Sequence, residues 1–191
     1  MRRTILITAS LLAAALLAAG PVLAYKALVH YTAFAVDMSN VAGRVRSGTI
    51  DVVIDRWSTD AERDTLVAAL REGGTDSLLR ALQKIDEPAG YIRTAGSVGY
   101  PLRFARQIPT SDGGRRVIIA TDRPVSFLEA SRQPRTIDYP FLLVDLRLDA
   151  EGKGQGKLLP LARVTADEDH VVEIENYASE PVRLTEVRES H

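Results

Sequence analysis

The chain has 191 residues, 46% of them hydrophobic and 26% charged, which is enough for one domain with a substantial core. It contains no cysteine, so disulfides, thiolate nucleophiles and thiolate metal sites are excluded. The net charge of −1 argues against general nucleic-acid or anionic-lipid binding, because both use an excess of Lys and Arg.

The first 24 residues (MRRTILITASLLAAALLAAGPVLA) have the layout of a signal peptide. Two arginines precede an apolar run, Gly20-Pro21 breaks it, and small residues lead to Ala24. This pattern predicts Sec-type export with cleavage after Ala24, an uncleaved anchor being the alternative. Cleavage lowers Lys plus Arg from 24 to 22 against 25 acids, so the mature chain carries −3. We therefore expect a periplasmic or extracellular protein with no stable membrane anchor.

The mature chain begins with an apolar, weakly patterned segment, residues 25–40. It fits either a lead-in strand or a segment packed across the mouth of a barrel. In residues 49–55, Ile50, Val52 and Ile54 alternate with polar neighbours, which predicts the first long strand.

Five carboxylates crowd the next stretch, DVVIDRWSTDAERDTLVAAL, and raise the question of a catalytic or metal site. Thr59 followed by Glu62 is instead typical of a capping box, in which acids in the first turn stabilise the positive end of a helix. Leucines at helical spacing then predict helices over residues 59–72 and 75–86, with Gly73-Gly74 ending the first. The acids are thus interpreted as a strand-to-helix junction.

Alternating apolar and polar residues predict strands through most of the remaining chain. The turn at residues 109–114 is rich in Gly, Asp and Ser, and the hairpin at 150–157 contains three glycines. A last hairpin is expected around residues 178–181, and residues 125–131 fit a helical turn or a strand. The expected strands are residues 90–94, 100–108, 116–122, 139–149, 158–165, 170–177 and 182–187.

These elements predict a single mainly β (α+β) domain over residues 25–191. The expected fold is an antiparallel β-barrel or sandwich of about eight strands, with a two-helix insertion after the first long strand.

No catalytic or metal motif emerges. The three histidines lack ligand spacing, and no GxSxG sequence supports a hydrolase triad. The acidic turn at residues 167–169 lacks the glycine-containing loop of a calcium site. We therefore expect no catalytic residues, metal or cofactor.

Arginines interleaved with aromatic residues on neighbouring strands are the candidate ligand-binding residues. Facing a barrel interior, they would hold an anionic head group by bidentate hydrogen bonds. Facing outward, they would form ordinary cross-strand ion pairs. The sole tryptophan, at the strand-to-helix junction, fits either a core anchor or a stacking residue at a pocket mouth. The candidate set is Arg93, Arg103, Arg106, Tyr91, Tyr100 and Trp57.

Several strings together resemble a family of small exported bacterial proteins of unknown function. They are DRWSTDAERDTLVAAL, GYIRTAGSVGYPLRFARQIP, RRVIIATDRPVSFLEA, IDYPFLLVDLRLDAEGKGQGKL and IENYASEPVRLTEVR. The resemblance covers roughly residues 43–188 and implies a single-domain exported protein; it implies no catalytic residues.

The sequence leaves three functions open. The first is a non-enzymatic, barrel-like module that binds a small, partly apolar ligand with an optional anionic group. The second is an envelope protein that binds another protein through an edge strand or an apolar face. The third is an enzyme whose acid or base is a buried carboxylate such as Asp55 or Glu129.

Overall fold

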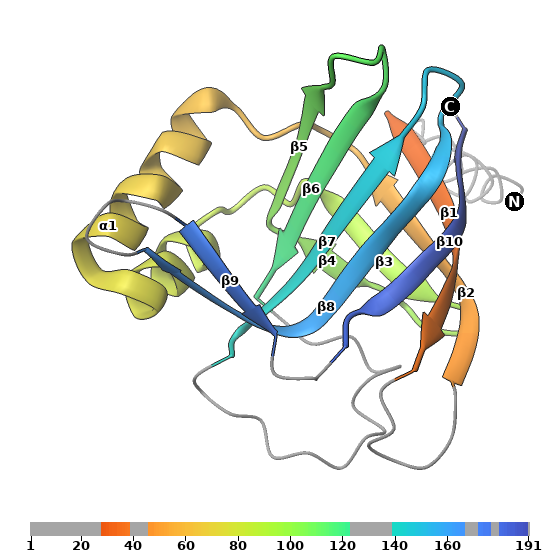
Figure 1. The fold of residues 1–191 in the computed structure, drawn as a ribbon. Coiled ribbons are helices and arrows are strands. Elements are labelled where there is room, and N and C mark those ends of the chain that lie inside the picture. Colours follow the sequence, from red (N-terminus) through yellow and green to blue (C-terminus); the bar gives the residue numbers. More distant parts are fainter. Residues whose placement is uncertain (1–27, 39–45, 123–138, 167–171, 177–179, 191) are drawn as a thin grey trace, which may run out of the picture.

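The computed structural model describes residues 28–38, 46–122, 139–166, 172–176 and 180–190. The predicted signal peptide and residues 125–131 lie outside these ranges. The described chain forms one helix, α1 (Asp60–Gln83), and a large antiparallel sheet (Figure 1). The strands are β1 (Val29–Asp37), β2 (Arg46–Ile54), β3 (Gly90–Thr94), β4 (Tyr100–Leu102), β5 (Phe104–Pro109), β6 (Arg115–Thr121), β7 (Phe141–Leu148), β8 (Lys153–Ala166), β9 (Val172–Asn176) and β10 (Val182–Ser190).

The sheet curls into a nearly closed barrel. Its strand order is β4-β3-β2-β1-β10-β8-β7-β6-β5, with β9 paired to β8 outside this path. The two ends of the path are consecutive in the chain, because only Arg103 separates β4 from β5. The backbone N–H of Arg103 donates to the carbonyl of Ala120 on β6 (3.0 Å), and the Thr121 hydroxyl donates to the carbonyl of Pro101 on β4 (2.9 Å). Of the two predicted architectures, the structure is therefore barrel-like.

The barrel interior is filled by side chains. Along β1, β6 and β7, buried residues that point inward recur at every second position, as the period of two requires. Tyr31 is the largest of these side chains, and aliphatic residues from all around the barrel pack with it in one cluster. Trp57 and Tyr100 are partly buried against the same cluster. The interior is thus a hydrophobic core, as in other small barrels.

The prediction of two helices was wrong, because one kinked helix spans the region. The predicted break is nevertheless present as a kink: Gly73 (φ −148°, ψ 21°) and Gly74 (φ 62°, ψ −152°) leave helical geometry, and two helical segments meet there within α1. Gly74 has a backbone conformation essentially restricted to glycine. The Thr75 hydroxyl, just after the kink, donates to the carbonyl of Val164 on β8 (2.9 Å), which ties the bend to the sheet.

The predicted strands differ from the structure at the two ends of the domain. The lead-in segment contains a central strand, β1, which pairs with β2 and β10 and does not cross the barrel mouth. The expected final hairpin is not formed, because β9 and β10 both pair with β8. Strand β8 is long enough for both: its first half lies in the barrel and its second half extends beyond it to pair with β9. The predicted strand began only at residue 158, because the glycines in residues 150–157 indicated a loop.

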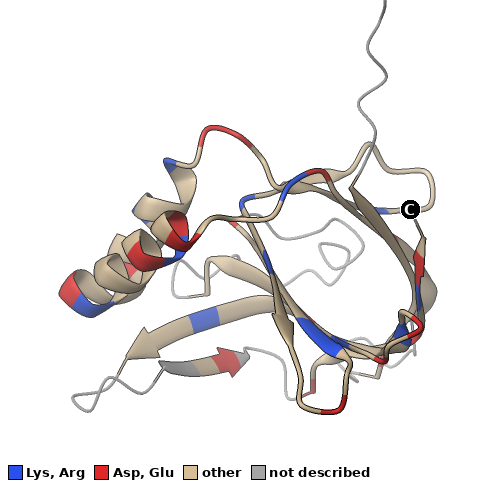
Figure 2. Ribbon diagram, turned by 90° about the horizontal axis from the view of Figure 1, so that it is seen from above, with Lys and Arg blue, Asp and Glu red and all other residues tan. Residues whose placement is uncertain are grey.

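Helix α1 lies outside the barrel wall, as the view along the barrel shows (Figure 2). Leu66, Leu70 and Leu82 of the helix pack with Phe141 of β7 and Val164 of β8 in a second buried cluster. The domain therefore has two apolar regions, the barrel interior and the layer between α1 and the outer face of the sheet.

Candidate functional site

An apolar cleft of about 360 Å³ lies between α1 and the outer face of the sheet. The helix contributes one wall, and strands β5 to β9 contribute the other. Thirteen of its fifteen lining residues are apolar, and the other two are Arg63 and Arg106. The apolar lining residues are Leu66, Val67, Leu70, Leu78, Leu82, Phe104, Ile108, Ile118, Ala120, Phe141, Leu143, Val164 and Ile174.

The cleft opens to solvent where the helix does not cover the strands. Ile108 of β5 is 38% exposed and Ile174 of β9 is 53% exposed, and both line the cleft. Outward positions on a barrel wall that faces water are normally polar, so apolar residues there indicate a surface that another element, a ligand or a partner covers. Helix α1 covers only part of it.

Both arginines of the cleft pair with carboxylates at the start of α1. The Nη1 atom of Arg106 lies 2.7 Å from Oδ1 of Asp60, and Arg63 pairs with the neighbouring Asp64. The hydrogen bond from Arg106 lowers the pKa of Asp60, and the bond to Asp64 raises the pKa of Arg63. The Asp60 side chain is 77% exposed, so its ion pair is a weak surface pair that another anion can replace at small cost.

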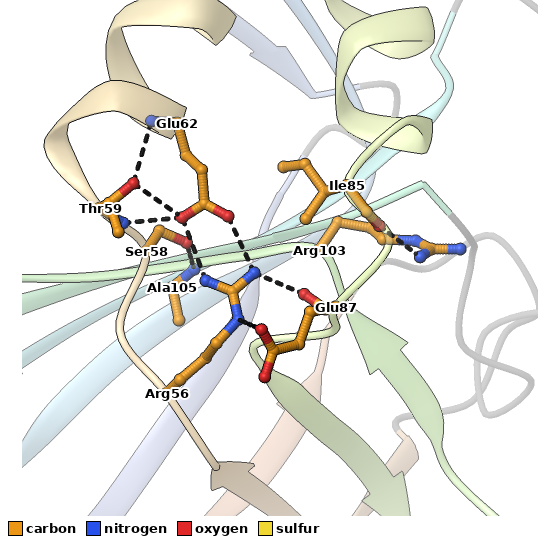
Figure 3. Close-up of polar contacts among 8 residues, drawn as sticks. All are labelled: Arg56, Ser58, Thr59, Glu62, Ile85, Glu87, Arg103 and Ala105. Carbon is orange, nitrogen blue, oxygen red and sulfur yellow. Dashed lines mark hydrogen bonds and ion pairs between the residues drawn. The ribbon is translucent and has the colours of Figure 1, made fainter.

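The helix start that carries these residues is held firmly (Figure 3). The predicted capping box is confirmed: Glu62 N–H donates to Thr59 Oγ1 (3.2 Å), and Thr59 N–H donates to Glu62 Oε2 (2.7 Å). Arg56 donates two bonds to the Glu62 carboxylate, at 3.0 and 2.9 Å, and this lowers the pKa of Glu62. Ser58 N–H donates to the carbonyl of Ala105 on β5 (2.8 Å). Glu62 thus fixes the start of the helix, and Ser58 joins that start to the barrel.

Arg103, one of the predicted ligand-binding residues, also serves the helix. Its Nη1 donates to the carbonyl of Ile85 just after α1 (2.9 Å), and its Nε lies 3.6 Å from Oδ1 of Asp122 (Figure 3 shows the first contact). The Asp122 side chain is 7% exposed. Arg103 therefore links the end of the helix to the end of β6 and does not line the cleft.

The remaining predicted residues lie elsewhere on the barrel. Arg93 is on the outer face of β3, 3.1 Å from Asp51 and 5.6 Å from the centre of the Tyr91 ring. The Arg93 guanidinium thus forms a cross-strand ion pair, which was the alternative interpretation of these arginines from the sequence. Trp57 and Tyr100 pack against the barrel core. Of the six predicted residues, only Arg106 lines the cleft.

Sequence reasoning missed Arg63 and the apolar outer wall. The signal was present in the runs VIIA (residues 117–120) and FLLV (residues 141–144), which lack the polar alternation of a wall facing water. An uninterrupted apolar run indicates a strand covered on both faces. It could have identified the wall, but not what covers it.

The candidate acid Asp55 is half-buried, and burial raises its pKa. It does not line the cleft. Glu129, the other candidate, lies outside the described residues. Within the described ranges, no three His, Asp or Glu side chains gather as metal ligands. No helix of the described part is both long and apolar enough to cross a membrane.

No protein-family model, curated protein or solved structure matches this chain.

Proposed function

We propose that this protein is an exported, non-enzymatic module that binds a small amphipathic ligand in the cleft beside α1. The observation that carries the proposal is an open cleft with apolar walls and two arginines. Binding sites for small molecules are of this kind: apolar volumes of about 300–1,000 Å³ with a few polar groups that orient the ligand.

The apolar part of the ligand would lie between the helix leucines and the β5–β7 wall. It would cover Ile108 and Ile174, which are partly exposed in the free protein. Each Å² of apolar surface removed from water contributes about 25 cal/mol, so an acyl chain is a suitable occupant.

The anionic head group would bind Arg106 in place of Asp60. A guanidinium binds a carboxylate through two parallel hydrogen bonds, and the exposed Asp60 competes weakly for it. Arg63 adds a second cation on the helix side of the cleft. The ligand site proposed here is therefore outside the barrel, whose interior is filled by buried side chains.

The test is calorimetric titration of the mature chain with dodecanoate, which has one carboxylate and one apolar chain. We expect saturable binding of one molecule per chain, weakened about tenfold by Arg106→Gln because a charge-assisted bond is lost. Arg93→Gln is the matched control, since Arg93 also pairs with a surface aspartate but lies on β3. Absence of saturable binding, or equal weakening by both substitutions, would contradict the proposal.

A protein partner in the envelope is the second candidate, and the exposure of Ile108 and Ile174 favours it. A protein surface would cover the open side of the cleft without filling it. The two candidates are distinguished by Ala120→Leu, which adds volume within the cleft. This substitution should abolish dodecanoate binding but leave a partner that contacts only the rim bound.

A further inference from the structure

A second, polar groove of about 520 Å³ lies on the outer face of β7, β8 and β10. It is separate from the apolar cleft, with which it shares no lining residue. Three of its side chains are cations, and one is a carboxylate. The lining residues are Asp145, Arg147, Gln155, Gly156, Lys157, Arg183, Leu184 and Thr185.

The strand register places like charges opposite one another at this groove. Lys157 of β8 is the direct partner of Arg183 on β10. One step along the sheet, Arg147 of β7 is the direct partner of Arg116 on β6. Like charges at directly opposed positions destabilise a sheet, so two such pairs side by side need a reason.

The single carboxylate of the groove does not neutralise these cations. Asp145 is opposite Lys157 in the register, but both of its oxygens accept hydrogen bonds from Arg116, at 2.8 and 3.0 Å. That interaction raises the pKa of Arg116. Within the described residues, Arg147, Lys157 and Arg183 have no ion pair. Four cations therefore surround one carboxylate, on a chain whose net charge is −1.

We propose that this groove binds a phosphate-bearing anion. Two arginines supply planar forks that match phosphate oxygens, and the lysine supplies a compact third charge. The groove volume exceeds the needs of one phosphate group, so it accommodates a diphosphate or a phosphodiester together with the groups that the phosphate links. The rigid strands fix the three side chains on one surface, and this arrangement does not depend on the proposed function of the cleft.

The same geometry has a consequence for stability. Without the anion, repulsion between Lys157 and Arg183 opposes folding; with the anion, the same charges become attractive contacts. Neutralising Lys157 should therefore weaken anion binding without lowering the melting temperature of the free protein. A lysine with only a structural role would not give this combination.

The experiment titrates the mature chain with inorganic pyrophosphate at low salt, and in parallel with vesicles that contain phosphatidylglycerol. Lys157→Gln and Arg183→Gln should each raise the dissociation constant about tenfold, and Lys157→Arg should retain most of the affinity. Arg71→Gln is the control, because Arg71 is an exposed cation on α1 outside the groove.

Each outcome decides the proposal. Binding of pyrophosphate that depends on the groove supports a free phosphate ligand, and binding of vesicles alone supports a lipid head group. No saturable binding of either probe overturns the proposal. It is equally overturned if Arg71→Gln weakens binding as much as Lys157→Gln, since the effect would then be one of net charge. A fall in melting temperature for Lys157→Gln with unchanged binding would show that the lysine is structural.

Discussion

At the residue scale, the arginines of this barrel have different structural roles. Arg103 fixes the end of α1, Arg93 pairs with Asp51 on an adjacent strand, and Arg106 lines an apolar cleft. Their spacing in the sequence predicted arginines in or beside consecutive strands, and the structure has Arg93 on β3, Arg103 between β4 and β5, and Arg106 on β5. Spacing could not tell which face each occupies relative to a helix packed from elsewhere in the chain.

Glu62 carries the most testable electrostatic interaction. Arg56 lowers the pKa of the Glu62 carboxyl, so Glu62 holds its proton less tightly in the folded state than in the unfolded state. The ionised carboxylate therefore stabilises the fold. This stabilisation is complete above the ordinary glutamate pKa of about 4.3 and is lost as the pH falls through the lower folded value.

Glu62→Gln should reduce the free energy of unfolding by about 1–2 kcal/mol at pH 7, because glutamine keeps the capping geometry but loses the ion pair with Arg56. The difference between the two proteins should shrink as the pH is lowered through the folded pKa. Urea denaturation at several pH values measures it. A difference that stays constant down to pH 2 would show that the charge of Glu62 is not responsible.

A substitution that frees Arg106 from its ion pair tests whether the anionic head group of a ligand binds this arginine. Asp60→Asn removes the exposed carboxylate that pairs with Arg106. If an anionic ligand must displace Asp60, the variant should bind dodecanoate several-fold more tightly, as expected for removal of a weak competing ion pair. Calorimetric titration of both proteins measures the change. Unchanged or weaker binding would argue that Arg106 does not contact the head group.

At the element scale, α1 is the part in which local sequence and final structure disagree. The capping box at Thr59 gave the correct start, because the signal is local. Gly73-Gly74 predicted an end, yet the helix resumes directly after a bend. The reason lies in the sheet: Thr75 bonds to Val164, a residue about ninety positions away, and Leu82 packs in the cluster of the outer wall.

The kink predicts an unusual response to a glycine substitution. Gly74→Ala should lower the free energy of unfolding by about 1–3 kcal/mol, because φ 62° and ψ −152° are strained for any residue with a Cβ atom. A Cβ atom there would meet nothing within 4 Å, so the cost is one of backbone conformation. Glu72→Ala, on an exposed position two residues earlier, is the control. In a regular helix, Gly→Ala stabilises instead, so a rise in stability would contradict the kink.

At the scale of the whole molecule, closure of the barrel depends on contacts that no single segment encodes. Alternation predicted most strands and their inward faces, because the period of two is imposed by the backbone itself. It could not show that residues 100–109 bend at Arg103 to complete the ring, or that β8 continues past the barrel to pair with β9. Both features arise from pairing between distant strands, and the second adds Val164 and Ile174 to the lining of the apolar cleft.

Neighbouring residues on β6 separate the role of the core from that of the cleft. Ile119 points into the barrel and is fully buried, whereas the next residue, Ala120, lines the cleft on the opposite face. Ile119→Ala should lower the free energy of unfolding by about 2–4 kcal/mol, the cost of a cavity in a packed core, with dodecanoate affinity unchanged for the folded fraction.

Ala120→Leu should have the opposite effects: it should abolish dodecanoate binding with little loss of stability, because the larger side chain fills existing space in the cleft. Chemical denaturation and calorimetry of the two variants measure both effects. If Ala120→Leu binds the ligand normally, the ligand does not occupy the cleft; if Ile119→Ala alone abolishes binding at full folding, the site is inside the barrel.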